Sequence, residues 1–388
     1  MEFIPYSRQQ VTHEDIDAVC AVLRSEYLTQ GPAVARFEEA FAARHEARHA
    51  VAVSSATAAL HLGCLALGVG PGSLVWTSPN SFLASANCAR YCGADVDFVD
   101  IDAATRNMSL DALRAKLEAA AAGGRLPDVL IPVDFSGLPC DLREMRQLAD
   151  RFGFRILEDA SHAAGASYLG HPVGSGHADI TVFSFHAVKI VTTGEGGLLT
   201  TASDELAHKL RLLRSHGMVR DPAAMAEPPE GPWVYEQQEL GFNYRLTDIQ
   251  AALGASQLQR LDRIHGERVA LADRYDELLR RLPLKLPPRL GDRVSAWHLY
   301  AIELDPRTSR ARAQVFAAMR AAAIGVNVHY IPIHCQPYYA RLGFHRGDFP
   351  AAEAYYAHAI TLPLFPAMTH AQQDRVVQTL GAALEGGA

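Results

Sequence analysis

The sequence is short of the features that mark secreted and membrane-spanning proteins. Six cysteines in 388 residues form no CxxC pair, and they are too few for a disulfide framework in a chain of this length. The first residues lack a basic region followed by an apolar stretch, and no apolar run approaches the roughly 20 residues of a membrane helix. We therefore expect a cytoplasmic protein with free thiols and no membrane partner.

An excess of positive charge is also missing. The chain carries 36 lysines and arginines against 43 aspartates and glutamates, a net charge of −7, so no nucleic-acid partner is expected. Three of its 17 histidines, His162, His171 and His177, lie close together in the sequence. They lack the i,i+4 spacing of an HExxH site, and we predict no metal centre from them.

What the sequence does contain is an alternation of apolar strands and helices. Helices are expected to begin at a capping box, Thr12–Asp15, and to cover 110–121 and 142–152. Continuous apolar strands between helices are typical of a mostly parallel sheet flanked by helices, which is an α/β fold. The expected strands cover 74–77, 95–99, 129–134, 155–159, 180–185 and 197–200.

The last third of the chain has a different pattern. A Pro/Glu-rich stretch, 221–239, predicts a surface loop that serves as a lid or a subunit-contact arm. A long helical segment, 247–282, then leads away from the main sheet. The segments WHLYAIEL and VNVHYIPI, with helices near 309–322, 350–359 and the end, fit a smaller α+β unit. We expect a large domain over 1–258, a small domain over 259–388, and an N-terminal segment that packs on the small one.

One group of residues suggests cofactor chemistry. Pyridoxal phosphate (PLP) needs a lysine for a Schiff base, a carboxylate for its ring nitrogen, phosphate donors and a flat side chain against its ring. Each candidate also has an ordinary structural explanation, such as a surface lysine or a helix-capping aspartate. Their joint occurrence favours PLP. The candidates are Lys189 beyond one strand, Asp159 at the end of another, Ser184, the helix start at Ala56 and Thr57, and Phe82.

Longer motifs strengthen this hypothesis. They run nearly from end to end: YLTQGP at 27–32, SSATAALH at 54–61, SPNSFLASAN at 78–87, LEDASHAAGA at 157–166, FSFHAVK at 183–189, TTGEGG at 192–197, RSHGM at 214–218 and GFNYRLTDIQAALG at 241–254. With these motifs the sequence resembles the DegT/DnrJ/EryC1/StrS family of sugar aminotransferases. The resemblance implies the PLP-dependent transferase type I fold, with a mostly parallel sheet flanked by helices and a smaller α+β C-terminal domain.

The resemblance also implies a role for each matching residue. Lys189 would carry PLP and move a proton between cofactor and sugar carbon, and Asp159 would pair with the ring nitrogen. Phe82 would stack on the ring, and His162 would lie near its phenolic oxygen. Ser184, Ala56 and Thr57 would bind the phosphate. Asn243 would reach it from the neighbouring subunit, which implies a homodimer with composite sites.

Within the family, several segments resemble the branch that acts in pseudaminic acid biosynthesis. They are IPYSRQQVTHEDIDAV, YLTQGPAV, SFHAVKIVTTGEGG and GPWVYEQQELGFNYRLTDIQ. This implies transfer of nitrogen from L-glutamate to C4 of a UDP-linked 4-keto-6-deoxy-N-acetylhexosamine. The alternatives are another nucleotide-linked 4-keto or 3-keto sugar, a cyclitol, or a PLP-binding regulatory protein without catalysis. Candidate substrate contacts are Tyr6, Thr29, Gln30, His186, Arg245, His329 and Tyr330.

Overall fold

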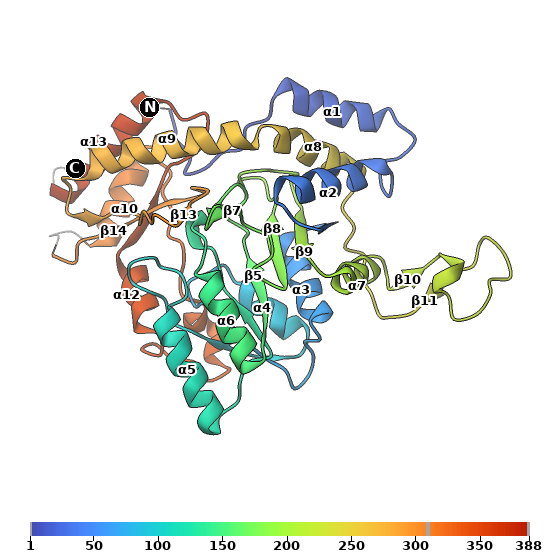
Figure 1. Cartoon of the computed structure of the whole chain (residues 1–388). Helices are drawn as coiled ribbons and strands as arrows, with labels where there is room; N and C mark the ends of the chain where they lie inside the picture. The colour runs from blue at the N-terminus through green and yellow to red at the C-terminus, as the bar shows by residue number, and fades with distance from the viewer. Residues whose placement is uncertain (1, 308–310, 386–388) are drawn as a thin grey trace.

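A mostly parallel sheet forms the centre of the molecule. The structure is a computed structural model that describes residues 2–307 and 311–385 (Figure 1). Within these residues the central sheet has seven strands in the order β1-β9-β8-β5-β4-β2-β3. β9 runs antiparallel to both of its neighbours, and the pairs from β8 to β3 are parallel, as the sequence predicts. The strands are β1 (His49–Val53), β2 (Leu74–Thr77), β3 (Asp95–Phe98), β4 (Val129–Ile131), β5 (Arg155–Asp159), β8 (Ile180–Ser184) and β9 (Gly197–Thr201).

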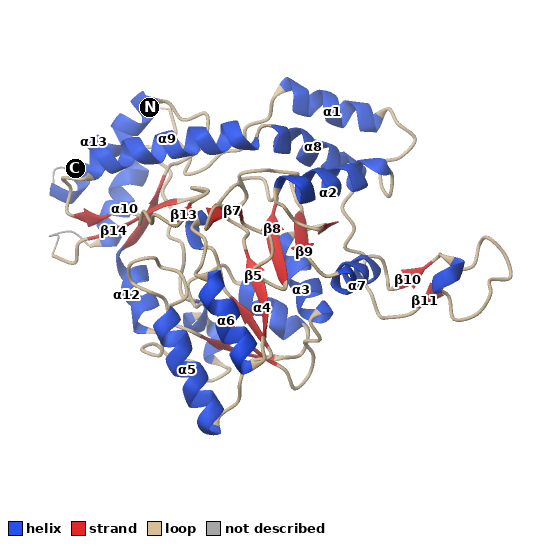
Figure 2. Ribbon diagram, viewed as in Figure 1, coloured by secondary structure: helices blue, strands red, loops and turns tan. Residues whose placement is uncertain are grey.

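Helices cover both faces of this sheet (Figure 2). Alternate residues of a strand point to opposite faces, so Val129 and Ile131 pack in one apolar cluster and Leu130 in another. The first cluster includes residues of α3 (Ala56–Ala66), α4 (Ala84–Tyr91) and α7 (Asp204–Arg214). The opposite face is covered by α2 (Pro32–Arg44), α5 (Leu110–Gly123), α6 (Leu142–Phe152) and α8 (Asp248–Gln259).

The predicted capping box at Thr12 is confirmed, and its acidic residue has a second role. Asp15 accepts a hydrogen bond from the backbone N–H of Thr12 at 2.9 Å, at the start of α1 (His13–Leu23). Its buried carboxylate also accepts from Gln257 Nε2 at 2.7 Å and from Arg260 at 2.6 Å. A buried carboxylate needs such partners, and these attach α1 to the end of α8.

A second group of elements lies at the far end of α9 (Leu261–Leu279), which crosses the molecule in Figure 1. Most of its apolar side chains form a cluster of their own, but those of η3, α11 and α12 pack in the first cluster of the central sheet. The group contains a sheet in the order β12-β14-β15 and several helices. The bounds are β12 (Leu284–Lys285), β14 (Tyr300–Leu304), β15 (Ala359–Leu362), α10 (Arg312–Ala321), η3 (Ile333–Cys335), α11 (Pro337–Ala340), α12 (Pro350–His358) and α13 (His370–Glu385). The N-terminal segment joins this group, because the N–H of Ile4 donates to the carbonyl of Ala323 at 3.0 Å.

Some predicted bounds differ from the structure. The helical segment 247–282 is interrupted at Arg260, which ends α8 and precedes α9. The predicted helix near 309–322 is α10, and its predicted start at Ser309 lies outside the described residues. The domain boundary at residue 258 stays a prediction. The outer ends of the two predicted domains, Met1 and Ala388, lie outside the described residues.

Residues 221–239 form the tip of an arm that extends away from the body beside α7 (Figure 1). Its base is a two-stranded ribbon of β10 (Met218–Val219) and β11 (Glu236–Gln237), with a short turn, η2 (Pro222–Ala224), near the tip. Trp233, Tyr235 and Leu240 are exposed along it. The arm is a surface segment, as predicted, and it exposes large apolar side chains to solvent.

The remaining elements are short. A small sheet has the order β13-β6-β7, with bounds β6 (Ser167–Tyr168), β7 (His171–Pro172) and β13 (Arg293–Val294), and a turn, η1 (Phe135–Gly137), follows β4. Among residues 2–307 and 311–385, no helix has both the length and the apolar character needed to cross a membrane.

Candidate active site

A cavity of about 620 Å³ opens beyond the ends of β5 and β8. This is where ligands sit in parallel α/β sheets, because the carboxyl ends of the strands meet there. Most of the residues predicted from the sequence line it: Tyr6, Ala56, Thr57, Phe82, Asp159, His162, Ser184, His186, Lys189, His329 and Tyr330. The chain therefore brings together side chains that are up to 324 positions apart in its sequence, from Tyr6 to Tyr330.

Lys189 follows β8 in a turn held by its own N–H, which donates to the carbonyl of His186 at 2.9 Å. Its side chain lines the cavity and is enclosed by other parts of the protein. Burial lowers the pKa of this amine to about 8, although the negative charge of Asp159 acts in the opposite direction. The amine can therefore lose its proton near neutral pH, as a nucleophile or a base must.

Asp159 ends β5, and both of its carboxylate oxygens are held. Ser85 donates to Oδ2 at 2.6 Å, and the hydroxyl of Ser161 donates to Oδ1 at 2.6 Å. These bonds fix the direction of a buried carboxylate at the cavity wall. Neither serine is predicted from the sequence as a site residue, although both stand inside the motifs SPNSFLASAN and LEDASHAAGA.

The N-terminus of α3 points its first residues at the same cavity. Ser55 caps the helix by accepting from the N–H of Ala58 at 3.1 Å, and Ala56 and Thr57 line the cavity. The first N–H groups of a helix have no partner within it, so they can bind an anion such as a phosphate. Ser184 lines the cavity from β8, opposite Gly197 of β9.

Gly197 allows β9 to lie against this helix start. A Cβ atom at position 197 would stand 2.5 Å from the carbonyl carbon and oxygen of Ser55 and 2.6 Å from the nitrogen of Ala56. All three are backbone atoms that cannot rotate away. Glycine at 197 is therefore a geometric requirement of the anion-binding wall.

A hydrogen-bonded pair, His162 and Tyr330, forms another wall. The N–H of Ser136 donates to His162 Nδ1 at 3.3 Å, so the ring carries its proton on Nε2, which lies 3.2 Å from the Tyr330 hydroxyl. Burial holds the pKa of His162 well below its usual range, with a further contribution from the charge of Lys189, and the ring is neutral. Phe82 lies across from this pair, with its ring 6.4 Å from that of Tyr330.

Three more of the expected substrate contacts, Tyr6, His186 and His329, line the cavity. The rings of Tyr6 and His329 are 5.7 Å apart, and His329 Nδ1 lies 2.8 Å from the Thr361 hydroxyl. His186 is exposed, with Nε2 3.9 Å from a carboxylate oxygen of Glu195. Further polar residues line the cavity that were not predicted from the sequence: Ser55, Ser81, Glu195, His298, Asn327 and Gln336.

Four predicted residues do not line the cavity of their own chain: Thr29, Gln30, Asn243 and Arg245. They stand on neighbouring segments, because Thr29 forms a bridge with Thr247 and Arg245 with Val53. Asn243 is exposed and bridges to Ser215 near the base of the arm. A single chain therefore does not place these four side chains in its own cavity.

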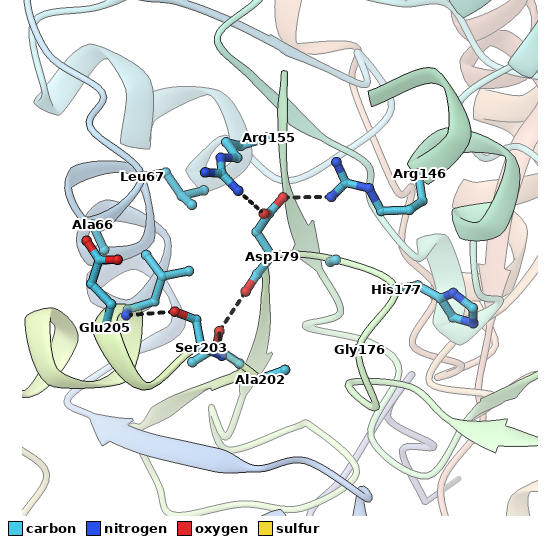
Figure 3. Close-up of a pocket in the computed structure, with 13 residues that line it drawn as sticks. Ala66, Leu67, Arg146, Arg155, Gly176, His177, Asp179, Ala202, Ser203 and Glu205 are labelled. Carbon is cyan, nitrogen blue, oxygen red and sulfur yellow. Dashed lines mark hydrogen bonds and ion pairs between the residues drawn. The ribbon is translucent and has the colours of Figure 1, made fainter. Parts of the chain in front are cut away.

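A second cavity, of about 360 Å³, lies at the opposite edge of the sheet, where β5 and β8 begin (Figure 3). Two arginines line it, Arg146 and Arg155, and each makes an ion pair of 2.9 Å with Asp179. The carboxylate of Asp179 thus satisfies both cations. His177 and the start of α7 also line this cavity, but no lysine is among the described residues around it. We place the chemistry at the cavity around Lys189.

Comparison with known proteins supports this choice. The model of the DegT/DnrJ/EryC1/StrS aminotransferase family matches residues 9–381. The spore coat polysaccharide biosynthesis protein SpsC of Bacillus subtilis (strain 168) is 39% identical, over 99% of this chain and 98% of its own.

Two solved structures are similar over nearly their whole lengths. Helicobacter pylori PseC, an aminotransferase involved in the biosynthesis of pseudoaminic acid, is 30% identical with a TM-score of 0.91, covering 99% of this chain and 100% of its own. The PLP form of Spr1654 from Streptococcus pneumoniae is 29% identical with a TM-score of 0.90, covering 100% of both chains. Spr1654 has also been solved in a PMP form.

The cavity fits the cofactor that these structures imply. A lysine with a lowered pKa, a carboxylate fixed by two serines and an anion-binding helix start surround one space, and each matches a different part of PLP. The chain belongs to the DegT/DnrJ/EryC1/StrS aminotransferase family and is a PLP-dependent sugar aminotransferase.

Proposed function

We propose that this enzyme transfers the amino group of L-glutamate to C4 of a UDP-linked 4-keto-6-deoxy-N-acetylhexosamine, in the cytoplasm, as a step of pseudaminic acid biosynthesis. The observation that carries the chemistry is the convergence of Lys189 and Asp159 in one cavity with the start of α3. Support for the sugar comes from the similarity to PseC along the whole chain. The free cysteines fit a reducing compartment.

We assign the inner wall to the cofactor. Lys189 would hold it covalently, Asp159 would pair with its ring nitrogen, and Phe82 would lie on its ring face. The N–H groups of Ala56 and Thr57, with the Ser184 hydroxyl, would bind its phosphate. When bound, PLP supplies a carrier for the amino group and a ring that accepts the electrons left when a C–H proton departs.

The remaining steps depend on the chain's own residues. A free Lys189 amine beside the reacting carbon would act as a base, and its lowered pKa would let it take up and return that proton near neutral pH. His162, neutral and donating from Nε2, would lie beside the phenolic oxygen of the cofactor. Tyr6, His186, His329 and Tyr330 would position the sugar in the outer part of the cavity.

We further propose that two copies complete each site. Asn243, Thr29, Gln30 and Arg245 do not line their own cavity, and they would contribute to the cavity of the partner subunit. The exposed Trp233 and Tyr235 on the arm favour its burial against the partner, because exposed apolar side chains in a cluster mark contact surfaces.

Replacement of Lys189 tests the chemical assignment. We expect Lys189→Ala to lose the visible absorption of the Schiff base and to lower turnover by more than about 10³-fold. Lys209→Ala on α7 is the control for a lost lysine. Turnover that persists in Lys189→Ala would contradict the assignment.

A substrate panel tests the sugar. UDP-, GDP- and dTDP-linked 4-keto and 3-keto sugars are incubated with L-glutamate, and the products are identified by NMR. We expect preference for a UDP-4-keto sugar with an N-acetyl group, aminated at C4. Turnover of only another nucleotide sugar would overturn the substrate and leave the role of Lys189 intact. A chain that binds PLP and aminates none of the sugars would favour the regulatory alternative.

A further inference from the structure

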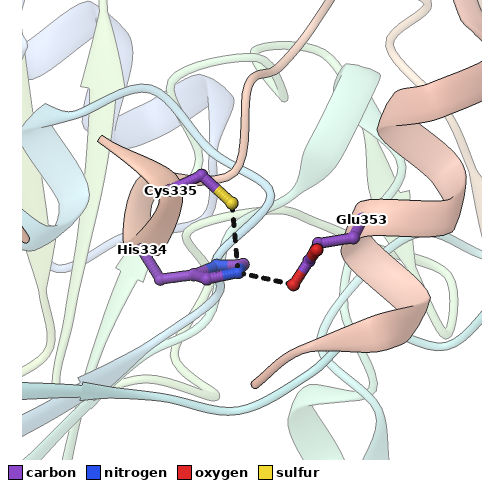
Figure 4. A group of neighbouring side chains, drawn as sticks. All are labelled: His334, Cys335 and Glu353. Atoms are coloured by element: carbon purple, nitrogen blue, oxygen red, sulfur yellow. Dashed lines mark hydrogen bonds and ion pairs between the residues drawn. The ribbon is translucent and has the colours of Figure 1, made fainter. Parts of the chain in front are cut away.

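Three metal-ligating side chains meet outside the catalytic cavity, between the turn η3 and the helix α12 (Figure 4). His334 and Cys335 come from the turn, and Glu353 comes from the helix. His334 Nε2 is 3.0 Å from Glu353 Oε1 and 3.3 Å from Cys335 Sγ. The three ligand atoms all lie within 4.8 Å of one another.

The surrounding packing holds these side chains in place. His334 is fully buried, and its ring packs edge-on against Phe349 with the centroids 4.8 Å apart. Glu353 Oε1 also accepts the N–H of Gly347 at 2.6 Å. The turn itself is fixed where the N–H of Ile333 donates to the carbonyl of Pro79 at 2.9 Å. These contacts hold the side chains of His334 and Glu353 in place before a cation binds.

The set of donor atoms is selective. One imidazole nitrogen, one thiolate and one carboxylate oxygen together suit Zn²⁺, which binds at about 2.0–2.3 Å from such atoms in a tetrahedral arrangement. Bonds of that length place neighbouring donors roughly 3.3–3.7 Å apart, by the tetrahedral geometry of the same sites. The two separations of 3.0 and 3.3 Å are within a few tenths of an ångström of this range.

The second nitrogen of His334 is compatible with this use. Its Nδ1 is buried and has no hydrogen-bond partner among the residues that the structure describes. Without a cation, the Glu353 carboxylate favours the proton on Nε2. A cation that binds Nε2 would displace this proton to Nδ1, so Zn²⁺ binding would be coupled to a change of tautomer.

We propose that His334, Cys335 and Glu353 form a zinc-binding site with a fourth position for water. None of the three lines the cavity around Lys189, but the next residue, Gln336, does. Bound Zn²⁺ would join η3 to α12 and so fix the segment that presents Gln336. No metal centre is predicted here from the sequence, because Glu353 reaches this turn from a different element, 18 residues after Cys335.

The test is calorimetric titration of the PLP-loaded enzyme with ZnCl₂. We expect one Zn²⁺ per chain with a dissociation constant of about 1 µM or lower, and a sulfur neighbour at about 2.3 Å in the X-ray absorption spectrum. Cys335→Ala and Glu353→Gln should each weaken binding at least about tenfold. Cys20→Ala, which removes a half-buried thiol on α1, should leave binding unchanged.

Both site variants are first checked for folding by their melting temperature and by the visible absorption of bound PLP. A wild-type enzyme that binds no Zn²⁺ in this range would overturn the proposal. Equal affinity of folded wild type and Cys335→Ala would do the same, because the three groups would then form only a hydrogen-bonded chain. Neither outcome depends on which sugar the enzyme aminates.

Discussion

At the scale of single residues, the environment of Lys189 disfavours its charge. Burial lowers its pKa from 10.5 to about 8, so the folded chain binds this proton less strongly than the unfolded chain does. The contribution of this lysine to the free energy of unfolding is therefore most favourable above pH 10.5, and it is lost as the pH falls towards 8. At neutral pH the free lysine therefore destabilises the protein without PLP.

We expect Lys189→Met to raise the free energy of unfolding of the PLP-free protein at pH 7. The gain should exceed that at pH 10 by about 1–3 kcal/mol. At pH 7 the buried amine must carry a charge that the fold disfavours or give up its proton, whereas at pH 10 the folded amine is already neutral and the unfolded one is close to its own pKa. Urea unfolding at the two pH values measures the difference. Lys209→Met is the control, and a gain in Lys189→Met that is the same at both pH values would contradict the lowered pKa.

The charged residues of the site could be predicted from the sequence better than the small polar ones. Lys189 and Asp159 stand at strand ends in recognisable motifs, and both line the cavity. Ser85 could not be assigned, because its contact with Asp159 depends on where α4 begins relative to β5. A single serine forms no sequence pattern, so its carboxylate partner can be identified only from the folded structure.

At the scale of elements, the close approach of β9 to α3 builds the wall proposed for the phosphate. Gly197→Ala would place its Cβ 2.5 Å from the backbone of Ser55 and push the helix start away. We expect PLP affinity to fall at least about tenfold and the free energy of unfolding to fall by about 1–3 kcal/mol. Fluorescence titration with PLP and urea unfolding measure the two effects.

Gly70→Ala is the matched control, because a Cβ at position 70 meets nothing within 4 Å. It should change the free energy of unfolding by less than about 1 kcal/mol. If Gly197→Ala binds PLP as tightly as Gly70→Ala, the start of α3 is not part of the phosphate site.

Element prediction succeeded where apolar runs and caps mark both ends. α6 has the predicted bounds, Leu142–Phe152, and β5 ends at Asp159 as expected. The break between α8 and α9 was missed because neither glycine nor proline marks Arg260. Its side chain pairs with the buried Asp15, so the position is constrained by a tertiary contact that local propensity does not encode.

At the scale of the whole molecule, the composite site can be tested by mixing subunits. Lys189→Ala removes a residue proposed to act in its own cavity, and Asn243→Ala one proposed to act in the partner's. In a mixed dimer, both defects fall on one site and the other site is intact. We expect each variant alone to be nearly inactive, and an equal mixture to recover about a quarter of wild-type activity.

The mixture is refolded or co-expressed so that subunits exchange, and activity is measured per site. The double variant Lys189→Ala/Asn243→Ala mixed with wild type provides the reciprocal arrangement, in which each mixed dimer has one defect at each site and should be inactive. Absence of recovery in the first mixture would show that Asn243 serves its own chain.

The hydrogen bonds of the N-terminal segment bear on how the enzyme is made. Ile4 pairs with Ala323 and Gly325, and the carbonyl of Tyr6 accepts the N–H of Leu364 at 3.0 Å. Chains leave the ribosome from the N-terminus, so Ile4 and Tyr6 emerge well before Ala323 and Leu364, with which they pair. Tyr6 is part of the wall around Lys189. The central sheet can therefore form during translation before the catalytic chamber closes, because the chamber needs residues up to Leu364.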